Sequence, residues 1–220
     1  MVNHYKMPLP ASYFFLYNIF MKNLPTTLPV FPLSGVIYFP KTNLPLNIFE
    51  QRYLNLVNDA YNRDKLMGMV QSKKESGSVY QVGCLGKISD YQKSQDGRIL
   101  INLTGISRFK ILEEISNDKL YREFKVDYKD FNEDNIETNN LIDTKSLMDN
   151  ARKFFKRNGL LLNWKEFEKL DQSQKINTLA MIAPITNEEK QKLLESISLK
   201  NKVETLESII SFYLHETNFN

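Results

Sequence analysis

The chain has 220 residues, 42% of them hydrophobic and 12% aromatic, which is the composition of a folded protein with a core of its own. A net charge of +3 at pH 7 is too small to indicate nucleic-acid binding by itself. The single cysteine, Cys84, excludes an internal disulfide and a cysteine-rich zinc site, and it is typical of a reducing cytoplasmic compartment.

Residues 1–27 form an N-terminal extension of a different character. Ala11–Phe20 is rich in apolar residues, but Pro8 and Pro10 precede it and no small-x-small cleavage motif follows. Ten such residues are also too few to span a bilayer. We expect a dispensable extension with translation starting at Met21; a segment that packs on the fold and a targeting signal are the alternatives.

The stretch from Leu28 to Tyr53 alternates short apolar runs with prolines. Each proline fixes its own φ and removes a backbone donor, so these runs are expected to be short strands, edge strands and tight corners. The four prolines are Pro29, Pro32, Pro40 and Pro45. From Phe49 the apolar period changes to that of an amphipathic helix. Its apolar positions are Tyr53, Leu54, Val57, Ala60 and Tyr61.

Strand patterns follow this first helix. Leu66–Gln71 has the composition of a buried strand, and Gly68 inside it indicates a bulge or a close backbone approach. Val79–Tyr91 and Arg98–Leu103 flank Asp96-Gly97, a pair that predicts a hairpin turn. The first half of the chain is therefore expected to be rich in β-structure.

The second half is expected to be helical. Residues 131–143 are polar and acidic, so we expect a linker between a β-rich domain over residues 28–130 and a helical bundle over residues 144–216. Thr186 with Glu189 is a capping box that should open one of these helices. The apolar stripes that define the helices include Leu147, Ala151, Phe154, Phe155, Trp164, Phe167, Ile176, Leu179, Leu193, Leu194, Ile197, Val203, Leu206 and Ile210.

Several motifs in the β-rich half match one family. The first set is Leu28-Pro29, Phe31-Pro32-Leu33, Phe39-Pro40, Leu44-Pro45-Leu46, Ile48-Phe49-Glu50 and Arg52-Tyr53. The second is Val82–Ile88, Asp96-Gly97-Arg98, Leu103-Thr104-Gly105 and Arg108-Phe109. In this order and spacing the chain resembles the N-terminal domain of Lon proteases.

The resemblance implies an α+β fold, in which a PUA-like pseudo-barrel with one packed helix precedes an α-helical bundle. It implies a structural role for the motif residues, which are Pro29, Pro32, Pro40, Pro45, Phe49, Glu50, Arg52, Tyr53, Gly83, Gly105, Arg108 and Phe109. In the family, Glu50 and Arg52 order the first helix against the sheet, although at i,i+2 within a helix the two would not face each other.

The function implied is binding without catalysis. His4 and His215, the only histidines, lie near the chain ends, and no phosphate-binding glycine motif is present. We therefore expect no enzyme activity, cofactor, metal site or membrane partner. The expected partners are unfolded or client polypeptides, or a protease complex for which the chain is an adaptor. Their best candidate contact residues are Phe31, Tyr38, Phe39, Met67 and Met69. For the two methionines, strand alternation favours a place in the core at least as much.

RNA binding is the alternative, since PUA-like barrels also recognise RNA. It would require a contiguous basic surface. The basic residues Arg152, Lys153, Lys156 and Arg157 are candidates, but on a helix that buries Phe154 and Phe155 they would form an ordinary solvated side.

Overall fold

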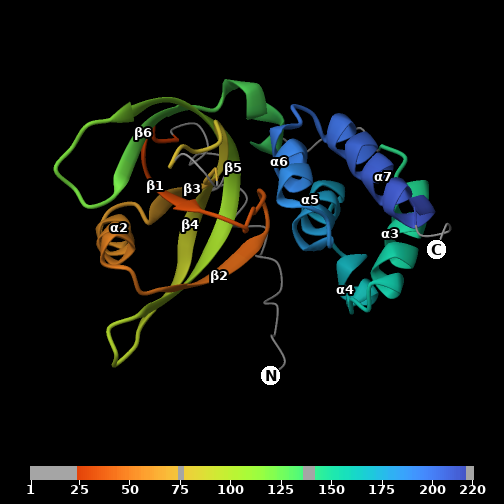
Figure 1. Ribbon diagram of the computed structural model, residues 1–220, viewed down its shortest axis with the longest axis horizontal. Coiled ribbons are helices and arrows are strands. Elements are labelled where there is room, and N and C mark those ends of the chain that lie inside the picture. Colours follow the sequence, from red (N-terminus) through yellow and green to blue (C-terminus); the bar gives the residue numbers. More distant parts are fainter. Residues whose placement is uncertain (1–23, 74–76, 136–141, 217–220) are drawn as a thin grey trace.

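The chain folds into a barrel of β-strands beside a layer of helices, as Figure 1 shows. The computed structural model describes residues 24–73, 77–135 and 142–216. Within these residues the strands are β1 (Thr27–Leu33), β2 (Asn43–Ile48), β3 (Leu66–Gln71), β4 (Val82–Lys93), β5 (Ile99–Ile115) and β6 (Arg122–Asp127). The helices are α2 (Gln51–Tyr61), the 3-10 helix η1 (Lys129–Asn135), α3 (Lys145–Arg157), α4 (Trp164–Phe167), α5 (Gln172–Ile182), α6 (Asn187–Glu195) and α7 (Leu199–Glu216). The expected α+β class is confirmed.

The strands close on themselves because β5 pairs with β4 along one edge and with both β2 and β6 along the other. The strand order is β2-β5-β4-β3-β1-β6, and β6 also pairs with β5. The first part of β5 pairs with β2, where Leu103 lies opposite Leu44. Its last part pairs with β6, where Ile111 lies opposite Val126. Closure leaves fewer open edges than a flat sheet of the same strands would have.

The prolines of β1 lie where the strand has a neighbour on one side only. Pro29 lies in the part of β1 that pairs with β6, and Pro32 in the part that pairs in parallel with β3. Pro45 is in β2, which stands at the end of the strand order. A proline nitrogen cannot donate to a ladder, so these positions tolerate it where a doubly paired one would not. The expectation of edge-like strands is confirmed.

Two buried apolar clusters hold the molecule together. The smaller cluster lies among the barrel strands and consists of Leu28, Val30, Leu66, Val70, Val79, Leu85, Ile106, Phe109, Ile111, Phe124 and Val126. The larger cluster is continuous from the opposite side of these strands, through α2, into the helices α3 to α7. Because successive strand residues point to opposite faces, β1 supplies Val30 to the first cluster and Phe31 to the second.

Two glycines allow close approaches that a side chain would prevent. A Cβ atom at Gly68 would lie 2.9 Å from the ring of Phe109. Of the two features expected at Gly68, a bulge or a close approach, this is the close approach. A Cβ atom at Gly105 would collide with the carbonyl oxygen of Phe39. There the backbone of β5 exchanges hydrogen bonds with the turn before β2, from Lys41 N to Gly105 O and from Gly105 N to Thr42 O, each 2.9 Å long.

The boundaries differ from the sequence expectations at three places. The start of the expected linker is structured, because η1 buries Phe131 and Asp134, whereas residues 136–141 lie outside the described residues. Ile197 lies beyond the end of α6 and is 65% exposed, so its assignment to that helix's apolar stripe is wrong. Most of the N-terminal extension is outside the described residues, but Leu24 packs against the smaller cluster.

Candidate polypeptide-binding surface

The side chains expected to contact polypeptides are buried. Phe31, Tyr38 and Phe39 are each at most 5% exposed, so the expectation of solvent-facing aromatic side chains there is wrong. Met67 and Met69, for which the core was the alternative, are at most 3% exposed. They lie on the side of the strands that faces α2 and the helical half, within the larger cluster. Strand alternation indicates which side chains share a face, but it cannot show which face of the barrel the helices cover.

Contacts fix these side chains in place. The ring of Phe31 lies 4.1 Å from that of Tyr53 in α2, measured between centroids. The hydroxyl of Tyr38 donates a 3.1 Å hydrogen bond to the carbonyl oxygen of Cys84. Burial, helped by the nearby Cys84, raises the pKa of the Tyr38 hydroxyl well above its ordinary value. Burial likewise raises the pKa of the Cys84 thiol, which makes it a poor nucleophile.

The motif pair Glu50 and Arg52 does interact, against the helix-spacing argument. Glu50 is the N-cap of α2 and has extended backbone angles, so the pair is not spaced as two helical residues. Its carboxylate accepts hydrogen bonds from Arg52 Nε and Nη2 at 3.1 and 2.8 Å. The guanidinium also lies over the ring of Tyr53, 4.4 Å from its centroid. Phe49, directly before this cap, is 67% exposed.

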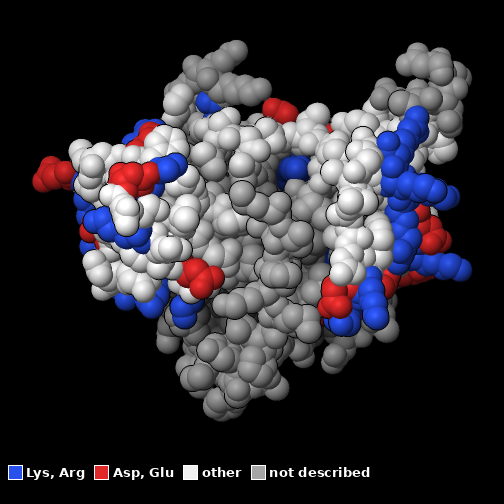
Figure 2. Space-filling model, turned by 90° about the horizontal axis from the view of Figure 1, so that it is seen from below, with Lys and Arg blue, Asp and Glu red and all other residues white. Residues whose placement is uncertain are grey.

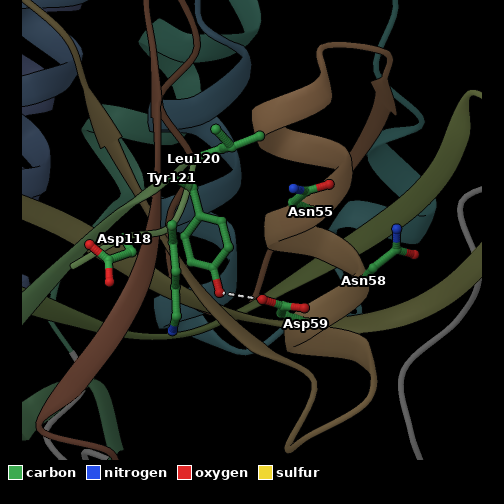
Figure 3. A pocket seen from close by; sticks show the side chains of 7 residues that line it. Asn55, Asn58, Asp59, Asp118, Leu120 and Tyr121 are labelled. Atoms are coloured by element: carbon green, nitrogen blue, oxygen red, sulfur yellow. Dashed lines mark hydrogen bonds between the residues drawn. The ribbon is translucent and has the colours of Figure 1, made fainter.

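A hollow of about 380 Å³ lies between α2 and the connection from β5 to β6 (Figure 3). Its lining residues are Asn55, Asn58, Asp59, Asp118, Lys119, Leu120 and Tyr121. The hydroxyl of Tyr121 donates a 2.7 Å hydrogen bond to Asp59 Oδ2 across the hollow. Burial and this carboxylate raise the pKa of Tyr121, which keeps its proton in place.

Amide and apolar groups border the same hollow. Asn55 Oδ1 accepts a hydrogen bond from Gln51 at 2.8 Å, and Asn58 Oδ1 accepts one from Tyr91 at 2.8 Å. These hydrogen bonds to the amide oxygens fix the orientation of both side chains. Leu120 lies at the end of the hollow nearer Asn55 in Figure 3 and is 60% exposed. An exposed leucine beside oriented amides is a suitable environment for an extended polypeptide.

This hollow could hardly be predicted from the sequence. Asn55, Asn58 and Asp59 occupy the polar side of an amphipathic helix, where such residues are ordinary. Leu120 follows a polar turn and is separated from α2 by more than 50 residues in the printed sequence. The pairing of β6 with β1, on which α2 packs through Tyr53, brings this turn to the helix.

Charge on the molecular surface is mixed in sign. Figure 2 shows basic and acidic side chains intermixed over the barrel half, while basic side chains gather along the outer edge of the helical half. In α3 the residues Arg152, Lys153, Lys156 and Arg157 are all exposed, as expected for a solvated side. Arg152 is paired with Glu168 at 2.6 Å.

Buried charge at the junction of the two halves centres on the motif residue Arg108. Its side chain in β5 is 2% exposed, and Asp134 of η1 accepts from it through both carboxylate oxygens at 2.7 to 3.1 Å. The same guanidinium donates to the carbonyl of Leu194, in the last turn of α6, and to those of Ser196 and Ile197 in the connection to α7. Arg108 therefore links the barrel, η1 and the helical half. The sequence resemblance implied a structural role for this residue but did not identify the groups that it binds.

Two kinds of feature are absent from the described residues, a membrane-spanning helix and a metal-binding cluster. No helix in that part of the chain is long and apolar enough to cross a membrane. No group of three or more His, Cys, Asp or Glu side chains there could hold a metal ion.

The barrel and helical layer define a class, that of the N-terminal domains of Lon proteases, for which solved structures exist. The structure titled as a Lon N-terminal domain protein from Xanthomonas campestris superimposes with a TM-score of 0.62 at 22% identity, covering 85% of this chain and 98% of that one. The N-terminal domain of the Mycobacterium avium complex Lon protease gives a TM-score of 0.63 at 16% identity, covering 84% and 98%. At these identities the likeness shows the fold.

The family itself is shown by the sequence. Residues 27–211 match the model of the ATP-dependent protease La (LON) substrate-binding domain, and the chain belongs to this family. The Lon protease of Syntrophus aciditrophicus is 28% identical over 210 residues, which are 87% of this chain and 26% of that protein. The Lon protease of Dictyoglomus thermophilum is 23% identical, covering 88% and 25%. The chain thus spans about a quarter of the length of these relatives.

Proposed function

We propose that this chain is a non-catalytic module that binds unfolded or otherwise exposed polypeptide segments. The observation that supports it most is the match of residues 27–211 to a substrate-binding domain. The match covers neither an ATPase nor a peptidase domain. Cooperation with a separate protease, as an adaptor, and residence in the cytoplasm are parts of the same proposal.

We place the binding surface at the hollow beside α2 rather than at the buried residues named from the sequence. Leu120 lines the hollow and is 60% exposed, and Phe49, directly before α2 and outside this lining, is 67% exposed. Both can bury apolar area against a polypeptide without any change in the fold. The amides of Asn55 and Asn58 supply polar groups that can pair with the main chain of a bound segment.

The test is fluorescence anisotropy with a labelled, permanently unfolded polypeptide, at low and moderate salt. We expect binding that tolerates salt, and a loss of affinity of about five- to thirty-fold in Phe49→Ser and Leu120→Ser, as for loss of an interface side chain worth about 1–2 kcal/mol. Leu161→Ser is the matched control, because Leu161 is equally apolar and fully exposed at 102% but lies between α3 and α4.

The outcomes separate the function from its location. If both variants bind as tightly as the unchanged protein, polypeptide binding stands as the function, but the hollow is not its binding surface. No binding by the unchanged protein would contradict the function itself. A labelled RNA in a parallel titration covers the alternative function, because tight binding that collapses with salt would assign the chain to the RNA-binding class.

A further inference from the structure

A buried lysine lies where the helical half meets the barrel. Lys202, in the first turns of α7, is 2% exposed, although a lysine side chain is rarely buried without a charged partner. Its Nζ atom donates a 2.7 Å hydrogen bond to Asn177 Oδ1 of α5, an amide rather than a carboxylate. The same nitrogen lies 5.4 Å from the ring centroid of Phe39.

Lys202 is connected to the barrel through this amide. Asn177 is 1% exposed and donates from Nδ2 to the carbonyl oxygen of Pro40 at 3.0 Å. Pro40 is in the turn before β2 that packs against Gly105 of β5. Lys202, Asn177 and Pro40 therefore form one hydrogen-bonded line from α7 through α5 into the barrel. Separation of the two halves would break it.

The charged and titratable groups that act on Lys202 come from three elements of the barrel half. They are Arg108 of β5, Asp134 of η1 and Cys84 of β4. Asp134 is already held by Arg108 through both of its oxygens, so it compensates a second cation poorly. Burial, with a smaller contribution from Arg108, lowers the pKa of Lys202 to about 7, while Asp134 and Cys84 act in the opposite direction.

We propose that Lys202 makes the junction between the barrel and the helical half proton-dependent. The closed junction holds Lys202 uncharged among Asn177, Phe39 and Arg108, and proton uptake favours a state in which α7 has moved away and Lys202 is hydrated. This device is independent of which polypeptide the module binds.

The direction of the pH effect follows from the two protonation states. A hydrated lysine has a pKa of about 10.4, so the open junction binds more protons than the closed one between pH 7 and that value. Opening is therefore favoured as the pH falls through this range, by about tenfold in the opening equilibrium per pH unit. Below about pH 7 the opening equilibrium no longer changes with pH, because Lys202 is charged in both states.

The sole cysteine reports the opening directly. Cys84 is 1% exposed in the larger cluster and belongs to the groups that act on Lys202, so a neutral thiol reagent can reach it only after local or global opening. The experiment measures the labelling rate of the full chain between pH 6 and 9.5 and divides it by the rate of a small-molecule thiol at the same pH. We expect the corrected rate to rise about tenfold per unit as the pH falls from 9.5 to 8. We expect Lys202→Met to remove that dependence.

Two controls complete the design. Lys200→Met removes a lysine two residues before Lys202 whose side chain is 73% exposed, and it should leave the pH dependence unchanged. A weak dependence of labelling on urea would identify local opening, and a dependence as steep as that of global unfolding would contradict the proposal. Equal pH profiles for the unchanged protein and Lys202→Met would also overturn it. If Lys202→Met does not fold, NMR titration of the Lys202 side chain in the unchanged protein tests the proposal instead. A pKa above 9 for this side chain would contradict a proton-dependent junction.

Discussion

At the scale of single residues, the arginine of the family motif has the largest structural consequence. Arg108 is 1% exposed, and its guanidinium satisfies the carboxylate of Asp134 and three main-chain carbonyls of the helical half. It also lies over the ring of Phe131, 4.4 Å from the centroid. Removal of this side chain would leave a buried carboxylate without a cation and several carbonyl acceptors without this donor.

We therefore expect Arg108→Met to lower the free energy of unfolding by about 3–5 kcal/mol. The carboxylate of Asp134 loses its charged partner in a buried site, although it keeps the hydrogen bond from the main-chain N–H of residue 108. The measurement is urea unfolding followed by circular dichroism. The matched control is Arg98→Met, which removes an arginine whose pair with Asp96 is half exposed on both sides. It should change stability little, since exposed pairs contribute little. Equal losses in the two variants would contradict the importance assigned to burial.

At the scale of elements, helix starts in the second half are specified by local sequence to different degrees. Thr186 opens α6 with a complete capping box: its hydroxyl accepts from Glu189 N at 3.2 Å, and Glu189 accepts from Thr186 N at 2.8 Å. The sequence predicted this box, and the prediction is confirmed. Thr144 stands at the corresponding position of α3 but makes no side-chain cap hydrogen bond.

The two threonines allow a matched comparison. We expect Thr186→Ala to lower the free energy of unfolding by about 0.5–2 kcal/mol, because a backbone N–H in the first turn of α6 loses its acceptor. Thr144→Ala should change it much less, since the same atoms are removed but no cap hydrogen bond is lost. Thermal unfolding of both variants is the measurement, and a larger loss at Thr144 would show that capping does not account for the difference.

At the scale of the whole molecule, the barrel and the helical half share one core. The larger cluster runs without a break from Met67 and Cys84 in the barrel to Phe155 and Leu206 in the helices. The lines through Arg108 and through Asn177 add polar connections across the same junction. A division into two independently folded domains is therefore not what this packing favours.

We expect the two halves to unfold in a single transition. Fluorescence of the sole tryptophan, Trp164, reports the helical half, and amide NMR signals of β4 and β5 report the barrel. The two urea midpoints should coincide, because loss of either half exposes the shared cluster. Separated midpoints would show that the halves are independent domains.

Local sequence determined the elements of this protein and the family to which it belongs. Prolines where strands are paired on one side, the Asp96-Gly97 turn, the apolar period of α2 and the capping box of α6 act over a few residues, so each is visible in the chain itself. The motifs that these features compose are also the ones shared with the substrate-binding domain of Lon proteases.

Tertiary structure alone decided which apolar residues remain exposed and which polar ones are buried. Phe31 and Phe49 are both phenylalanines in the same motif-rich segment, yet one is 5% and the other 67% exposed. Phe31 lies on the strand face that the helices cover, whereas Phe49 lies in the connection from β2 to α2. Lys202 resembles the other lysines of its helix until α5 and the turn at Pro40 enclose it. Burial depends on contacts between residues far apart in the chain, and local periodicity does not predict these contacts.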